Sequence, residues 1–110
     1  MDDEDFAQRL ALGHEIRGTE FKGPGPRSDG RLVAQVVRAV LGMANRRDGG
    51  SVIIGVEDNG AVLTPVGLSQ SALATWTYDA MADQIARYAD PSVTFALEPK
   101  AYKWKQLHSS

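Results

Sequence analysis

The segment 51–56 constrains the fold more strongly than any other part of the chain. Its core, Val-Ile-Ile at positions 52–54, is continuously apolar and β-branched, which is typical of a strand covered on both faces. Gly49-Gly50 precedes it and permits backbone conformations that other residues avoid. Asp58-Asn59-Gly60 follows it and predicts a tight turn. We therefore expect a central strand, with Asp58 placed where a rigid element reaches the surface.

Apolar spacing predicts three helices around this strand. Residues 31–44 give the clearest one, because apolar side chains recur on one helical face and Ser28 or Asp29 can cap its start. Residues 3–12 give a short helix with an acidic first turn, which suits a helix N-terminus. Residues 72–89 give a second long helix that ends before a proline.

Several further segments are expected to be extended. In the strand predicted over 14–22, the apolar residues fall an odd number of positions apart, and Gly18 between them predicts a bulge. Residues 61–66 form a weaker return strand, 92–98 alternate between apolar and polar, and 101–104 extend a final strand. Together these elements predict an α/β (α+β) fold, a single two-layer domain in which a small mixed β-sheet packs against two long helices.

Length and composition fit one ordinary domain. The 110 residues suffice for one hydrophobic core, so we expect a single domain over 1–110, with its core at about 13–98, an N-terminal helix within 1–12 and a frayed tail at 105–110. Cysteine is absent, which excludes disulfides and thiolate metal sites. No apolar stretch approaches the roughly 20 residues that span a bilayer, and the N-terminus is acidic, unlike a signal peptide. We expect no membrane partner and a cytoplasmic location.

Charge is distributed unevenly along the chain. The formal net charge of −2 argues against a nucleic-acid partner, but four acidic residues at 2–5 account for much of it. Affinity for phosphates depends on local charge and not on the whole-chain sum. Solvated surface arginines would give the same composition. The basic residues that we consider for phosphate contacts are Arg17, Lys22, Arg38, Arg46 and Arg47.

Three carboxylates are candidates for a metal site: Glu15, Glu20 and Asp58. Carboxylate oxygens are the hard ligands that Mg²⁺ and Mn²⁺ prefer. A bulge at Gly18 would turn both glutamates to one side of the strand. In phosphodiester hydrolysis such a metal activates water, and Lys22 could share the stabilisation of the developing charge. Acidic residues at a strand edge are also commonly solvated groups without a chemical role.

The order of these motifs resembles the Schlafen-type AlbA domain over about residues 13–98. The motifs are Glu15-x-x-x-x-Glu20-Phe21-Lys22, a helix ending in Met43-Ala44-Asn45, and the run from Gly49-Gly50 through Gly55 to Asp58-Asn59-Gly60. The resemblance implies a compact α/β domain of the kind found in bacterial and archaeal regulators, which binds DNA or RNA. From the related nuclease of animal Schlafen proteins it also implies catalytic and metal-binding roles for Glu15, Glu20 and Asp58, with Mg or Mn as cofactor and Lys22 beside the second glutamate.

Three functions stay open from the sequence. The first, which the resemblance favours, is a nucleic-acid-binding domain that contacts DNA or RNA through a basic surface. The second is a metal-dependent endonuclease. The Schlafen nuclease places two such domains in one chain, so this single copy would need a homodimer to reproduce that arrangement. The third is a regulatory or protein-interaction module of a larger protein, which the acidic N-terminus favours.

Overall fold

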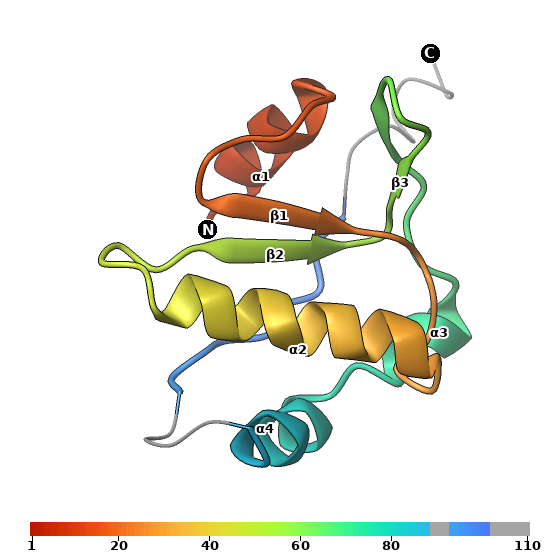
Figure 1. The fold of residues 1–110 in the computed structure, drawn as a ribbon. Coiled ribbons are helices and arrows are strands. Elements are labelled where there is room, and N and C mark those ends of the chain that lie inside the picture. The colour runs from red at the N-terminus through yellow and green to blue at the C-terminus, as the bar shows by residue number, and fades with distance from the viewer. Residues whose placement is uncertain (89–92, 102–110) are drawn as a thin grey trace.

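The residues that the computed structural model describes, 1–88 and 93–101, form four helices and four short strands (Figure 1). Within these ranges, no helix combines the length and the apolar character needed to cross a membrane. In chain order the elements are α1 (Asp3–Ala11), β1 (Thr19–Lys22), α2 (Gly30–Ala44), β2 (Ser51–Ile54), β3 (Val56–Asp58), β4 (Leu63–Pro65), α3 (Gln70–Ala74) and α4 (Tyr78–Ala86).

The strands form two small sheets. β1 and β2 are parallel, with Thr19 opposite Ser51 and Lys22 opposite Ile54. β3 and β4 form an antiparallel hairpin after the chain has turned at Gly55. The predicted mixed α/β class is confirmed, but parallel and antiparallel pairing occur in separate two-stranded sheets and not in one mixed sheet.

β2 is covered on both faces, as its apolar run predicts. Val52 and Ile54 point to one face, where they pack against the buried side of α2. Ile53 points to the other face and joins a cluster with Phe6 and Leu10 of α1. Figure 1 shows α1 and α2 on opposite sides of the β1–β2 pair.

α2 confirms the clearest of the predicted helices. Asp29 caps it, because its Oδ1 atom accepts hydrogen bonds from the amides of Arg31, at 3.1 Å, and Leu32, at 3.2 Å. Its inner face supplies the largest share of the main core, with buried side chains at Leu32, Val33, Val36 and Val37. Because this face is packed in the core, the end of α2 at Ala44 is held in place, and the loop before β2 begins there.

The second long helix, predicted over 72–89, is not confirmed. In its place lie α3, α4 and a break at Thr75–Thr77. The Thr75 hydroxyl donates to the carbonyl of Ala72 at 2.7 Å, and Thr77 accepts from the amide of Ala80 at 3.3 Å to cap α4. Between them Trp76 is buried, and its indole Nε1–H donates to the carbonyl of Gly25 at 2.9 Å. Tertiary anchoring of Trp76 and two local threonine bonds replace the helical turn that apolar spacing predicted.

The strand predicted over 92–98 is absent from the part that is described, residues 93–98, although its alternation is real. Val93, Phe95 and Leu97 are partly buried against the α2 core, and the residues between them are exposed. The ring of Phe95 stacks on that of Tyr78 with centroids 4.8 Å apart. The apolar pattern therefore predicted correctly which side chains turn inward, but the hydrogen-bonded strand that it also predicted is not formed in residues 93–98. Residue 92, residues 102–104 of the predicted final strand and the tail 105–110 lie outside the described residues.

Lys100 joins the end of this segment to α1. Its Nζ atom donates to Oδ1 of Asp3 at 3.0 Å and lies 3.6 Å from Oε2 of Glu98. The hydrogen bond that Lys100 donates to the Asp3 carboxylate raises the pKa of Lys100. One of the four N-terminal acidic residues is thereby paired with a base from the other end of the described chain.

Candidate functional site

A pocket of about 450 Å³ opens at the end of the β1–β2 pair where both strands begin. Three arginines line it, and each comes from a different segment: Arg9 from the last turn of α1, Arg17 from the turn before β1, and Arg46 from the loop before β2. The remaining lining residues are Gly18, Asp48, Gly49, Gly50 and Ser51. The site is therefore rich in cationic hydrogen-bond donors.

The first wall is a β-turn over residues 16–19. The amide of Thr19 donates to the carbonyl of Ile16 at 3.1 Å, and Gly18 has a φ of 83° at the third position, where turns of this kind favour glycine. The predicted bulge at Gly18 is wrong, because the chain reverses direction there and β1 begins only at Thr19. This reversal places Arg17, which is exposed, at the tip of the turn.

The second wall is the loop between α2 and β2. Gly49 has a φ of 67°, and its amide donates to the carbonyl of Arg46 at 3.1 Å. The Arg46 side chain folds back over this turn, with Nε donating to the carbonyl of Gly49 at 3.2 Å. A Cβ on Gly50 would meet the sulfur of Met43 and lie 3.0 Å from the carbonyl oxygen of Gly18. Gly49-Gly50 thus performs the role expected from the sequence, letting the chain enter β2 against a neighbouring backbone.

The two walls are joined directly. The amide of Ser51 donates to the carbonyl of Gly18 at 2.9 Å, which continues the parallel ladder by one step into the pocket. In Figure 1 the turn before β1 and the loop before β2 lie at the same end of the strand pair. Arg17 and Arg46, 29 positions apart in the sequence, are therefore held at one site by backbone hydrogen bonds.

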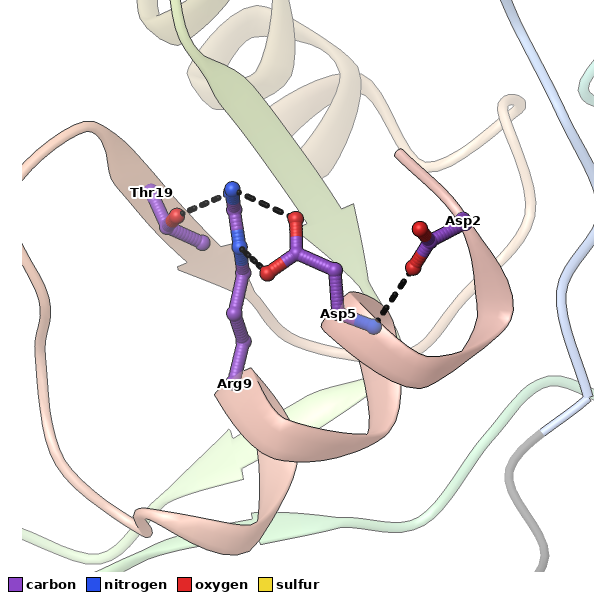
Figure 2. Close-up of polar contacts among 4 residues, drawn as sticks. All are labelled: Asp2, Asp5, Arg9 and Thr19. Carbon is purple, nitrogen blue, oxygen red and sulfur yellow. Dashed lines mark hydrogen bonds and ion pairs between the residues drawn. The ribbon is translucent and has the colours of Figure 1, made fainter.

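Arg9 is fixed by its neighbours. Figure 2 shows its side chain between Asp5, one helical turn earlier, and Thr19 at the start of β1. Its Nε and Nη2 atoms donate to the two carboxylate oxygens of Asp5 at 3.3 and 2.9 Å, and Nη1 donates to Oγ1 of Thr19 at 2.8 Å. Thr19 is buried, so this last bond ties the guanidinium to the core. The sequence analysis missed Arg9, although the i, i+4 spacing of Asp5 and Arg9 in a predicted helix is the signal that would have found it.

The structure brings together only part of the predicted basic set. Arg17 and Arg46 line the pocket, and Arg47 follows Arg46 in the same exposed loop without lining it. Arg38 is exposed on α2, about two turns before that helix ends. Lys22 lies at the far end of β1, where its Nζ is 3.8 Å from Oε2 of Glu20. Lys22 and Arg38 therefore do not contribute to the same pocket.

Glu15, Glu20 and Asp58 do not form a metal-binding group. In residues 1–88 and 93–101, no three acidic or histidine side chains are arranged to hold one ion. The turn at Gly18 puts Glu15 before the chain reversal and Glu20 after it. Asp58 lies on the separate β3–β4 hairpin, where its Oδ1 atom accepts from the amide of Gly60 at 2.8 Å. The bulge that was expected to gather the glutamates is absent, and metal binding stays a prediction of the resemblance.

The pocket is suited to anions. Guanidinium groups are permanently charged, and their planar array of donors matches the oxygens of phosphate. No aromatic side chain is among the lining residues of this pocket, so it offers no surface on which a base could stack. Asp48 is the one carboxylate in the lining and opposes the three positive charges in part.

No protein-family model, curated protein or solved structure matches this chain. The resemblance to the Schlafen-type AlbA domain therefore stays an expectation from the motif order.

Proposed function

We propose that this chain is a nucleic-acid-binding domain whose pocket arginines contact phosphates. The observation that carries the proposal is the convergence of Arg9, Arg17 and Arg46 on one recess in a chain whose formal net charge is −2. Because the whole chain is slightly acidic, a general positive surface does not explain the cluster. Local positive charge of this kind is what attracts a polyanion.

The composition of the pocket indicates the type of contact. Contacts to phosphate and sugar position a protein on nucleic acid without reading its sequence, whereas base contacts specify sequence. The lining combines guanidinium groups with glycines and small polar residues, and the exposed Arg47 lies next to it along the chain. We therefore propose binding through the phosphate backbone with little sequence preference. The family resemblance, which implies nucleic-acid binding, supports the same function, and the proposal keeps the cytoplasmic location expected from the sequence.

Binding of a labelled single-stranded oligonucleotide, followed by fluorescence anisotropy, tests this function. We expect measurable affinity at low salt, with a slope of log Kobs against log salt between about −0.7 and −2, as for one to three neutralised charges on a single strand. Arg46→Gln is expected to weaken binding about tenfold, because it removes charge-assisted hydrogen bonds to phosphate.

Arg38→Gln is the matched comparison, since it removes the same charge from an exposed site outside the pocket. We expect it to change the affinity by less than about twofold, as for a distant charge that is screened by salt. Equal losses in the two variants would mean that net charge, and not the pocket, governs binding. A wild-type protein that binds no oligonucleotide at low salt would refute the proposed function.

A further inference from the structure

We propose that the arginine pocket binds the phosphate monoester at the end of a nucleic-acid strand in preference to an internal phosphodiester. This inference rests on the proposed function and gives the pocket a specific ligand. The pocket lies between two backbone segments, the turn before β1 and the loop before β2, and is open to solvent on its outer side. An internal phosphate carries nucleotides on both sides, whereas a terminal one continues in a single direction and can enter a recess end-on.

The size of the pocket supports this choice. Its volume of about 450 Å³ lies in the range of pockets that bind a small ligand. Its lining is formed by backbone at Gly18, Gly49 and Gly50 as well as by side chains. Glycine at these positions lets a ligand approach the main chain closely. A phosphate with part of one sugar fits this description better than a continuous strand.

Charge and donor number also favour the monoester. A phosphate monoester carries a charge of about −1.5 to −2 at neutral pH and three acceptor oxygens, whereas an internal diester carries −1 and two free oxygens. Three arginines and Asp48 give the lining a formal charge of +2, and counting Asp5, the partner of Arg9, leaves +1. The formal charge of the lining is positive whether or not Asp5 is counted, so the second negative charge of the monoester adds to the attraction.

Two of the three guanidinium groups are already held in place. Arg9 uses three of its five N–H donors on Asp5 and Thr19, which leaves two for a ligand. Arg46 uses Nε on the carbonyl of Gly49, which leaves its terminal nitrogens for the same purpose. Side chains fixed before binding lose less conformational entropy when the ligand arrives. Arg17, exposed at the turn tip, lines the same pocket and adds further N–H donors.

The experiment compares one single-stranded sequence in three forms: with a 5′-phosphate, with a 3′-phosphate, and with hydroxyl groups at both ends. We expect one phosphorylated form to bind about tenfold more tightly than the hydroxyl form, as for additional charge-assisted hydrogen bonds. Arg46→Gln and Arg17→Gln should each reduce that preference to less than about threefold, and Arg38→Gln should leave it unchanged. Circular dichroism spectra of each variant check that the fold is retained.

The possible outcomes distinguish failure of this inference from failure of the proposed function on which it rests. A preference for the 5′- or the 3′-phosphate that needs Arg17 and Arg46 supports the inference and identifies the end that is bound. Equal binding of all three forms overturns it while leaving nucleic-acid binding intact. A preference that survives in Arg17→Gln and Arg46→Gln also overturns it, because the terminal phosphate would then lie elsewhere. Failure of every form to bind removes both proposals.

Discussion

Replacing Arg17 and Arg46 together by glutamate is expected to weaken binding of single-stranded nucleic acid about hundredfold at low salt. Each arginine contributes charge-assisted hydrogen bonds worth about 1.5 kcal/mol, or roughly tenfold in affinity, and the new carboxylates would repel phosphate as well. Both side chains are exposed and line the same pocket, so the substitutions should not disturb the core. Fluorescence anisotropy over a range of salt concentrations measures the loss and should show a smaller salt slope.

A double variant on α2 is the matched control. Arg31→Glu combined with Arg38→Glu changes the net charge by the same amount, and both side chains are exposed outside the pocket. We expect this control to weaken binding by less than about fivefold, through long-range repulsion that added salt removes. If the control loses as much affinity as the pocket variant, net charge and not the pocket governs binding.

The second large effect is a loss of stability, which we expect from a substitution at Gly55, the junction between β2 and β3. Gly55 has a φ of 109° and is buried, and a Cβ there would lie 3.2 Å from the backbone of Gly67. Its amide donates to the carbonyl of Lys22 at 2.8 Å, and its carbonyl accepts from the amides of Val66 and Gly67, both at 2.9 Å. Gly55→Ala should therefore lower the free energy of unfolding by about 3 kcal/mol, from backbone strain together with a steric clash.

Gly60→Ala separates these two causes. Gly60 also has a positive φ, of 91°, but it is exposed and nothing lies within 4 Å of the position of its Cβ. We expect this change to cost about 1 kcal/mol, from backbone strain alone. Urea denaturation followed by the fluorescence of Trp76 and Trp104 and by circular dichroism measures both variants. Equal losses would mean that the contact with Gly67 does not hold the junction in place.

Much of the fold was predictable because local signals agree with tertiary packing. The β-branched run in β2 predicts a strand covered on both faces, and α1 and α2 cover it. The apolar face of α2 and its Asp29 cap were equally clear, because period and capping point to the same helix. In segment 93–98 the alternation predicted which side chains turn inward, although the backbone there forms no ladder.

The elements that were predicted wrongly have two physical causes, which are the backbone direction at single glycines and tertiary contacts between distant residues. Gly18 and Gly55 both adopt positive φ, and sequence shows that glycine permits this but not which way the chain then runs. The break between α3 and α4 depends on Trp76 bonding to Gly25, a contact 51 residues away that no local pattern contains. Tertiary contacts of this kind override local periodicity.

The candidate site was predictable only in part, because local patterns do not show which distant residues the fold brings together. Arg17 and Arg46 were singled out by charge, but nothing local indicated that Arg38 would stay apart from them. Arg9 was missed although its i, i+4 spacing from Asp5 is a local signal, and its hydrogen bond to Thr19 on another element has no counterpart in the sequence pattern. The three carboxylates were expected to meet at one edge, but they form no such group in the described residues, where Asp58 lies on the separate β3–β4 hairpin.

An NMR titration with inorganic phosphate and with a 5′-phosphorylated dinucleotide tests most directly whether the arginine pocket binds phosphate. We expect the largest saturable shifts at the amides of Gly18, Gly49 and Gly50 and at the Nε–H signals of Arg9 and Arg46, all of which belong to the pocket. Shifts concentrated on α4 or on the β3–β4 hairpin, or no saturable shift in the pocket, would contradict phosphate binding there.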